Sequence, residues 1–350
     1  MGSTEQICLG RILDAAANRA REALRVLEDY CRFTLNDAIL SGELKRLRHE
    51  LAAALAVLPD HHLLEARETE RDVGRELTAS GEESRQSLEA VLRANCKRLQ
   101  EALRSLEEFG KVRSSELGQR LEKLRYESYT LERAIALGAR ARERLAKVRL
   151  CVLITESACA GPMDRIIQEA AAGGAGMIQL REKDLNDKEL LESARKVRQW
   201  TSQAGVLFIV NDRPDIAFLA NADGVHLGQD DMPVMEARQI LGPDRLIGVS
   251  THSLDQVRQA VLDGANYIGV GPMFPSGTKD FPEFPGLDFV REAIGLTSLP
   301  AFAIGGISVE NVNQAAAVEV QRIAVSQAVC QAVNPSGVAQ EILRHLQKSV

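Results

Sequence analysis

From Val148 onward, short apolar runs alternate with stretches of helical pattern, and this alternation constrains the fold more than any other feature. Eight runs have the length and character of buried strands, at 150–155, 177–180, 206–210, 224–227, 246–250, 267–271, 301–304 and 322–325. Helical stretches cover 164–172, 187–203, 232–241, 254–263, 287–294, 309–317 and 337–347. Eight strands interleaved with helical stretches predict an α/β domain, a compact TIM (β/α)8 barrel over 148–350. The alternative, an open doubly wound sheet, would usually have fewer strands and a glycine fingerprint after the first.

Residues 1–147 have a different pattern, in which leucine and alanine recur every three or four positions and proline occurs once. This pattern predicts an all-α domain. It contains an internal repeat, because 18–30 and 97–109 share the core Glu-Ala-Leu-Arg-x-Leu-Glu-(Asp/Glu)-aromatic. Each copy precedes a second helix with Leu-Arg-x-Glu, at 47–50 and 124–127. Two such hairpins predict a pseudo-symmetric four-helix bundle, joined stiffly to the barrel because helical pattern continues almost to the first strand.

Composition excludes several classes of protein. The net charge is −6 and aromatic residues make up 4% of the chain, which argues against a nucleic-acid partner. No apolar run is long enough to span a membrane, and the N-terminus lacks the charged and apolar segments of a secretion signal. The six cysteines have no C-x-x-C spacing and are expected to be reduced. These observations predict a cytoplasmic protein.

In a TIM barrel the functional residues lie at the carboxyl ends of the strands. The second strand ends in Gln179–Lys183, where alternation places Gln179, Arg181 and Lys183 on one side, and the two intervening residues on the other. Lys279, after the sixth strand, adds a third cation to the same end of the barrel. Cations this close repel each other unless an anion lies between them. We therefore expect an anionic ligand here.

Carboxylates and phosphate-binding groups follow the other strands. Asp212 and Asp231 follow the third and fourth strands, with Asp230 a weaker candidate, and Mg²⁺ takes one or two carboxylates together with phosphate oxygens. Hydroxyls and exposed backbone amides lie at 276–278 and 305–306, where phosphate sites recur in this fold. The pattern suits a magnesium-bound diphosphate and a second phosphorylated substrate, and hence a transfer in which diphosphate leaves. The alternatives are turn capping and simple glycine turns.

Together these motifs resemble thiamine-phosphate synthase over 148–347. The resemblance is carried by Gln-Leu-Arg-Glu-Lys at 179–183, Asn-Asp-Arg at 211–213, Asp-Gly-Val-His-Leu-Gly-Gln at 223–229 with Asp231, Gly-Val-Ser-x-His at 248–252, Gly-Pro-x-Phe at 271–274 with Thr278-Lys279, and Ala-Ile-Gly-Gly-Ile at 303–307. This family joins 4-amino-2-methyl-5-(diphosphooxymethyl)pyrimidine to 4-methyl-5-(2-phosphooxyethyl)thiazole, or to its carboxylated precursor. The products are thiamine phosphate and diphosphate, and no protein nucleophile is needed.

The resemblance also implies roles for individual residues. The pyrimidine diphosphate would be held by Gln179, Leu180, Arg181, Glu182, Lys183, Asn211, Ser250 and Lys279. Four of these would also assist catalysis, namely Arg181, Lys183, Ser250 and Lys279. Mg²⁺ would bind Asp212 and Asp231. The thiazole phosphate would be held by Ser276, Gly277, Thr278, Gly306, Ser326 and Gln327, although Ser276 stands where Thr is usual and Gln327 where many members have Ser.

The first half resembles a small helical domain fused ahead of the synthase in some bacteria and linked to phosphorylation of hydroxymethylpyrimidine phosphate. A kinase is therefore one expectation for 1–147, and a scaffold or dimerisation domain is the other. Its charged residues either form ion pairs along the helices or, through Arg19, Arg21 and Arg25, line a phosphate cleft. For the barrel, the rivals are a thiazole tautomerase that uses His252 as acid–base and a non-catalytic thiamine-ligand sensor. The expected partners are small phosphorylated molecules, and homo-oligomerisation is left open.

Overall fold

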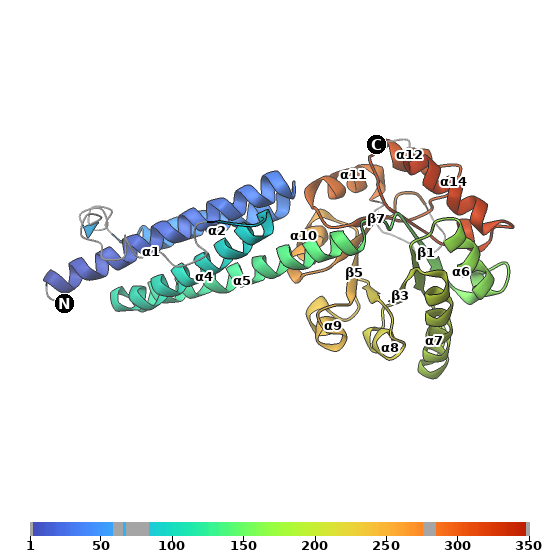
Figure 1. Ribbon diagram of the computed structural model, residues 1–350, viewed down its shortest axis with the longest axis horizontal. Coiled ribbons are helices and arrows are strands. Elements are labelled where there is room, and N and C mark those ends of the chain that lie inside the picture. The colour runs from blue at the N-terminus through green and yellow to red at the C-terminus, as the bar shows by residue number, and fades with distance from the viewer. Residues whose placement is uncertain (1–2, 59–65, 68–83, 276–284, 348–350) are drawn as a thin grey trace. The chain divides into compact units, whose positions relative to one another are not determined.

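The computed structural model describes residues 3–58, 66–67, 84–275 and 285–347. It divides into two compact units, 1–135 and 136–350 (Figure 1). The division falls inside helix α5 (Ser115–Arg144), ahead of the change of sequence pattern at Val148. The end of α5 belongs to the barrel because Leu145, which follows it, is fully buried in the barrel core.

Eight strands form one closed parallel barrel in chain order, which confirms the predicted TIM barrel and excludes the open sheet. The strands are β1 (Leu150–Ile154), β2 (Met177–Leu180), β3 (Leu207–Asn211), β4 (Gly224–Leu227), β5 (Leu246–Thr251), β6 (Tyr267–Val270), β7 (Ala301–Ala303) and β8 (Ile323–Val325). Each pairs with the next, and β8 closes the barrel against β1, with Ile323 opposite Leu150. All eight carboxyl ends therefore meet at one end of the barrel, which is called the mouth below.

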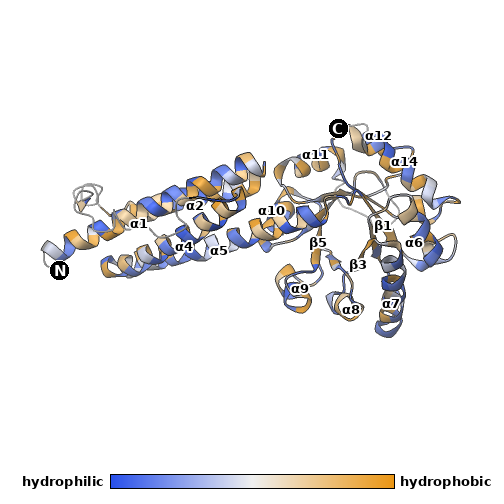
Figure 2. Cartoon of the chain, in the orientation of Figure 1, coloured by the Kyte–Doolittle hydropathy of each residue, from blue (hydrophilic) through white to orange (hydrophobic). Residues whose placement is uncertain are grey.

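Helices surround the barrel: α6 (Met163–Ala172), α7 (Asp187–Ala204), α8 (Pro214–Leu219), α9 (Val234–Leu241), α10 (Leu254–Asp263), α11 (Gly286–Leu296), α12 (Val312–Ala317), α13 (Gln327–Cys330) and α14 (Pro335–Gln347). Local sequence sets their ends; α7 starts with a capping box made by Asn186 and Glu189 and stops at Gly205, which has φ 70°. Apolar and polar residues alternate along the helices, as amphipathic helices require (Figure 2). Sequence reasoning missed α8 and α13, which are only six and four residues long.

The barrel interior changes character along its axis. Toward the amino ends of the strands the inward side chains form an apolar core, which includes Cys151, Leu153, Met177, Ile209, Leu246, Tyr267, Phe302 and Ala324. Alternation carries the same inward side toward the mouth, where it bears polar residues instead. These are Gln179, Asn211, His226 and Ser250. The apolar layer thus forms a floor beneath a polar layer that opens at the mouth.

In the residues described for it, the first unit is all-helical, as predicted. Its elements are α1 (Ser3–Asp29), a π-helical turn η1 (Tyr30–Thr34), α2 (Ala38–Leu55), α4 (Leu88–Arg113) and the first part of α5. Helix α1 packs against both α2 and α4. The two repeat copies lie in α1 and α4, and each is followed by the second helix of its hairpin, α2 or α5.

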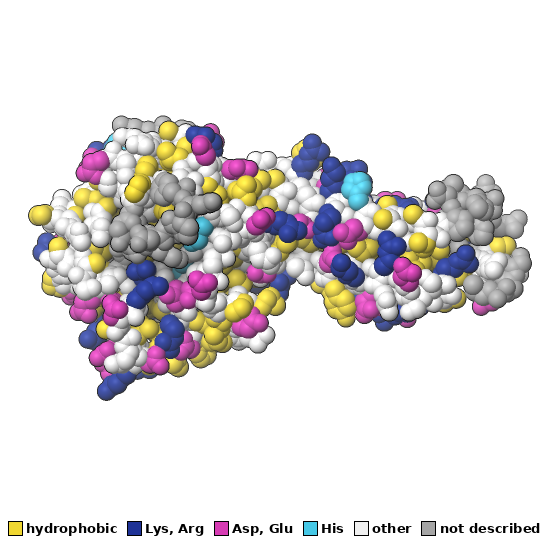
Figure 3. All heavy atoms as spheres, turned by 180° about the vertical axis from the view of Figure 1, so that it is seen from behind, with side chains coloured by type: hydrophobic (Ala, Val, Ile, Leu, Met, Phe, Trp, Pro, Cys, Tyr) yellow, Lys and Arg dark blue, Asp and Glu magenta, His cyan; other side chains and the backbone are white. Residues whose placement is uncertain are grey.

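The repeat is preserved in contacts as well as in sequence. In the first hairpin Glu28 pairs with Arg48 at 3.2 Å, and in the second the equivalent Glu107 pairs with Arg125 at 2.7 Å. Arg25 also pairs with Glu28, at 3.4 Å, which favours the ion-pair interpretation for this arginine over the phosphate cleft. In Figure 3, Lys and Arg side chains stand beside Asp and Glu side chains on the helical surface.

Candidate active site

The polar layer connects four neighbouring strands. The Gln179 side chain donates to Asn211 Oδ1 at 2.8 Å, which joins β2 to β3. Asn211 lies opposite His226 in the β3–β4 register, and His226 Nε2 lies 2.9 Å from Ser250 Oγ on β5. The structure therefore brings three of the predicted substrate residues, Gln179, Asn211 and Ser250, to one wall of the mouth. Gln179 is only 4% exposed, and the hydrogen bond to Asn211 orients its amide.

The two predicted metal ligands lie beside each other at the same mouth. Asp212 adopts φ 62°, an uncommon backbone conformation that Asp tolerates better than most residues, and its N–H still donates to the His226 carbonyl at 2.8 Å. Burial and, as a smaller cause, the neighbouring Asp231 carboxyl together raise the pKa of Asp212 to about 6. Lys183 Nζ lies 3.5 Å from Asp212 Oδ2 and opposes this shift. Asp231 is oriented by its own turn, since it accepts from the Gly228 N–H at 2.6 Å.

This donor set fits Mg²⁺. Within the described ranges, no group of three or more His, Cys, Asp or Glu side chains is arranged to hold a metal ion. Mg²⁺ does not need such a group, because it usually binds one or two carboxylates and completes its shell with water and substrate phosphate. Besides burial, which is the larger cause, the Asp231 carboxyl raises the pKa of Asp212, and Lys183 offsets this excess of negative charge only in part. A divalent cation would remove that excess.

The rest of the stretch after β2 is fixed by its backbone and by β1. The Arg181 N–H donates to the Ile154 carbonyl at 2.9 Å, and its own carbonyl accepts from Thr155 Oγ1 at 2.6 Å. Glu182 accepts from the Glu156 N–H at 2.6 Å, which turns its carboxylate toward β1. Leu180 is 1% exposed, and alternation along the strand turns its side chain away from the barrel interior. Substrate contacts by Leu180, Arg181, Glu182 and Lys183 stay predictions.

The predicted thiazole-phosphate residues are described only in part. Ser276, Gly277, Thr278 and Lys279 lie outside the described residues. Gly306 has φ 60°, and a Cβ there would lie 2.6 Å from the Pro275 carbonyl oxygen, so glycine is required by both conformation and space. Ser326 and Gln327 stand at the start of α13, directly after β8. The binding roles of these residues stay predictions.

Sequence reasoning missed His226 of the polar layer and Tyr267 of the floor beneath it. The His226 ring lies between Ser250 Oγ and the Tyr267 hydroxyl, whose oxygen is 3.2 Å from Nδ1. Burial lowers the pKa of His226 to about 4. A signal was present, because His226 sits at an inward strand position within the motif at 223–229, but only cross-strand geometry shows what it contacts.

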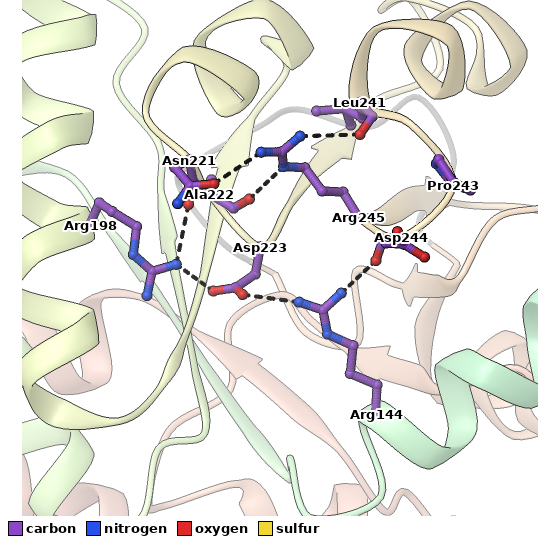
Figure 4. Close-up of a pocket in the computed structure, with 9 residues that line it drawn as sticks. All are labelled: Arg144, Arg198, Asn221, Ala222, Asp223, Leu241, Pro243, Asp244 and Arg245. Atoms are coloured by element: carbon purple, nitrogen blue, oxygen red, sulfur yellow. Dashed lines mark hydrogen bonds and ion pairs between the residues drawn. The ribbon is translucent and has the colours of Figure 1, made fainter.

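A second polar cluster surrounds a cavity of about 420 Å³ at the opposite end of the strands (Figure 4). Arg144 and Arg198 both pair with Asp223, at 3.0 and 2.7 Å, and Arg144 also donates to the Asp244 carbonyl. Arg245 donates to two backbone carbonyls and one side-chain amide oxygen. Since all three guanidinium groups are engaged by protein, we interpret this cluster as structural. It fastens the end of α5 to the base of the barrel.

Comparison with known proteins agrees with the geometry. Residues 150–329 match the family described as thiamine monophosphate synthase. The chain is 43% identical over 338 residues to thiamine-phosphate synthase of Nostoc sp., an alignment that covers 97% of this chain and 94% of the relative. The chain belongs to the thiamine-phosphate synthase family. This confirms the resemblance inferred from the strand-end motifs.

Further matches cover nearly the whole chain or one of its two units. Thiamine-phosphate synthase of Rhodopirellula baltica is 44% identical over 338 residues, which covers 94% of this chain and 90% of the relative. Thiamine phosphate pyrophosphorylase from Pyrococcus furiosus has a similar structure, with a TM-score of 0.53 and 33% identity over 58% of this chain and 98% of that one. Residues 11–134 match the ThiD2 family, which supports a kinase-like first unit. No helix in the described part of the chain is long and apolar enough to cross a membrane.

Proposed function

We propose that the barrel transfers the pyrimidine methylene group from diphosphate to the thiazole nitrogen, forming thiamine phosphate in thiamine biosynthesis. The observation that carries this proposal is the mouth itself. Paired carboxylates, a lysine and a polar layer converge there, in a chain whose family is thiamine-phosphate synthase. The substrates would be the pyrimidine diphosphate and the thiazole phosphate named by the resemblance.

Different residues of the mouth would bind the ring and the diphosphate group of the pyrimidine diphosphate. Gln179 and Asn211, bonded to each other, would present amide groups to the ring. Arg181, Lys183 and Lys279 would bind the diphosphate oxygens. Asp212 and Asp231 would hold Mg²⁺, which when bound would neutralise charge on the diphosphate.

The reaction then needs no protein nucleophile. The bond between the methylene carbon and the diphosphate oxygen breaks, and the electron pair leaves with diphosphate. The aminopyrimidine delocalises the positive charge, and the thiazole nitrogen donates its lone pair to form the new carbon–nitrogen bond. The protein contributes by orienting both substrates and by placing cations where charge develops on the leaving group.

The test is the release of diphosphate and the formation of thiamine phosphate by the full chain with both substrates and Mg²⁺. We expect both products in equal amounts and their loss in Asp212→Ala. A tautomerase would convert a thiazole phosphate without the pyrimidine, and a sensor would bind ligands without releasing diphosphate. Synthesis that persists in Asp212→Ala would remove the proposed metal role.

We also propose that the helical unit phosphorylates hydroxymethylpyrimidine phosphate with ATP, because 11–134 matches the ThiD2 family. Its product would be the diphosphate that the barrel consumes. The full chain should then make thiamine phosphate from ATP, hydroxymethylpyrimidine phosphate and thiazole phosphate. The Asp212→Ala chain should still form ADP and pyrimidine diphosphate while making no thiamine phosphate. A lack of ADP in both proteins would favour a scaffold or dimerisation role. A cytoplasmic location and a homo-oligomer stay predictions.

A further inference from the structure

Three side chains from adjacent strands form a continuous hydrogen-bonded chain inside the barrel. The Tyr267 hydroxyl lies 3.2 Å from His226 Nδ1, and His226 Nε2 lies 2.9 Å from Ser250 Oγ. Tyr267 is 2% exposed and belongs to the apolar floor, whereas Ser250 is half-buried in the polar layer above it. The chain thus runs from the floor of the barrel to its mouth.

Glycines on two strands make room for this chain. A Cβ at Gly248 of β5 would lie 2.1 Å from Cζ of the Tyr267 ring, a distance that no real structure could hold. A Cβ at Gly269 of β6 would lie 3.3 Å from His226 Cε1, which is also tight. These inward positions would otherwise carry side chains of the core. Glycine at these two positions therefore leaves space for the tyrosine and histidine rings.

The direction of the hydrogen bonds follows from Tyr267. In the part of the chain that the structure describes, His226 is the hydrogen-bond partner of its hydroxyl, and a buried hydroxyl hydrogen without an acceptor is unfavourable. The hydroxyl must then donate to Nδ1, which leaves Nδ1 without a proton. A neutral ring with a bare Nδ1 has its proton on Nε2, and so donates to Ser250 Oγ. Ser250 already accepts one bond, and its own hydrogen is free to be donated.

We propose that His226 and Tyr267 are positioning residues that make Ser250 a hydrogen-bond donor toward the substrate at the mouth. The partner would be an acceptor atom of the pyrimidine diphosphate, either a ring nitrogen or a phosphate oxygen. This role rests on the function proposed above, because it assumes that Ser250 contacts that substrate. The bond directions within the protein do not depend on any substrate.

The protonation of His226 can be measured directly. The full chain has six histidines and can be labelled with ¹⁵N at the imidazole nitrogens, with the His226 signals identified by their absence in His226→Gln. Nitrogen shifts distinguish the two neutral tautomers. We expect the Nε2–H tautomer in the wild type and a mixture in Tyr267→Phe, which removes only the hydroxyl. An Nδ1–H tautomer in the wild type would overturn the proposal.

Kinetic measurements test whether the hydrogen bonds from Tyr267 through His226 affect the reaction through Ser250. Tyr267→Phe should lower kcat/KM for the pyrimidine diphosphate by about tenfold, the usual effect of one hydrogen bond at a site. In a Ser250→Ala background the same substitution should have no further effect, because its target is already gone. A second tenfold loss in that background would show that Tyr267 acts independently of Ser250 and would refute the positioning role.

Phe302→Leu is the matched control for packing. Phe302 is as buried as Tyr267, and its ring contacts the tyrosine ring edge-on, with centroids 5.5 Å apart. This variant should lose stability and yet keep the Nε2–H tautomer and a kcat/KM within about twofold, because the hydrogen-bonded chain is intact. A shift of tautomer in Phe302→Leu would mean that packing sets the bond directions. If the wild type makes no thiamine phosphate, the proposed function fails, while the tautomer measurement still decides the bond directions.

Discussion

Replacement of Asp212 with Asn should stabilise the metal-free protein while abolishing synthesis of thiamine phosphate. Asn removes the negative charge that Asp212 holds beside Asp231, and like Asp it tolerates the φ of 62° at this position. The backbone bond to the His226 carbonyl does not depend on the side chain. The two effects have opposite signs because the same pair of carboxylates is unfavourable without a cation and necessary with one.

The size of the effect follows from the pKa. A rise of the Asp212 pKa from 3.8 to about 6 corresponds to at most ~3 kcal/mol at neutral pH. Part of this is burial, which Asn also experiences, and the lost Lys183 ion pair offsets up to about 1 kcal/mol because the lysine is 56% exposed. We therefore expect a gain of ~1 kcal/mol in the free energy of unfolding. In a domain of this size the gain corresponds to about 2–4 °C in Tm.

The gain should depend on pH. A carboxyl whose pKa is raised in the folded state contributes stability that is present below its unfolded pKa and is lost as pH rises through the folded value. The wild type therefore loses this contribution between about pH 4 and pH 6, and the advantage of Asp212→Asn should be complete above pH 7 and absent near pH 4. Thermal unfolding in EDTA across this range measures it.

Ligand addition should reverse the order of the two proteins. With Mg²⁺ and diphosphate the wild type should gain stability, and Asp212→Asn should gain little, because one of the two carboxylates is missing. Asp230→Asn is the matched control, since Asp230 is exposed on the same turn and should show neither effect. A metal-free Asp212→Asn protein that unfolds at a lower temperature than the wild type at pH 8 would refute the reasoning.

Two further predictions concern the stability of the barrel. Gly248→Ala should destabilise the protein by about 1–3 kcal/mol in urea unfolding, because its Cβ collides with the ring of Tyr267; a neutral effect would mean that the ring is free to move. A fragment of 148–350 should be less stable than one of 136–350 by at least about 2 kcal/mol, because it lacks the fully buried Leu145. Equal urea midpoints for the two fragments would show that the end of α5 is dispensable.

The sequence predicted those features that depend on the local order of residues along the chain. Buried parallel strands are continuous apolar runs, so all eight were found, and helices of ten or more residues showed their period. The adjacency of Asp212 and Asp231 could also be predicted, because carboxyl ends of neighbouring parallel strands must meet. The short helix α8 was missed because it is stabilised by its place against β3 and β4 rather than by its own pattern.

The features that were missed depend on distances between strands. From the sequence, Gly248 would only be expected to weaken its strand. The position of the Tyr267 ring shows why glycine is needed there. The raised pKa of Asp212 depends on burial, which charge patterns in the sequence do not reveal. The domain division at 135 was likewise hidden, because the helical pattern of α5 is continuous while its contacts change.

The matched ion pairs of the helical unit bear on its ancestry. Glu28–Arg48 and Glu107–Arg125 occupy equivalent places, and the equivalent Leu24 and Leu103 are both fully buried. A single hairpin would expose that leucine face to water, and two identical copies of it could cover each other's leucines as a dimer. We infer that the bundle arose by fusion of such a dimer. Once the copies were joined, a substitution no longer acted twice, and each half could acquire its own side chains.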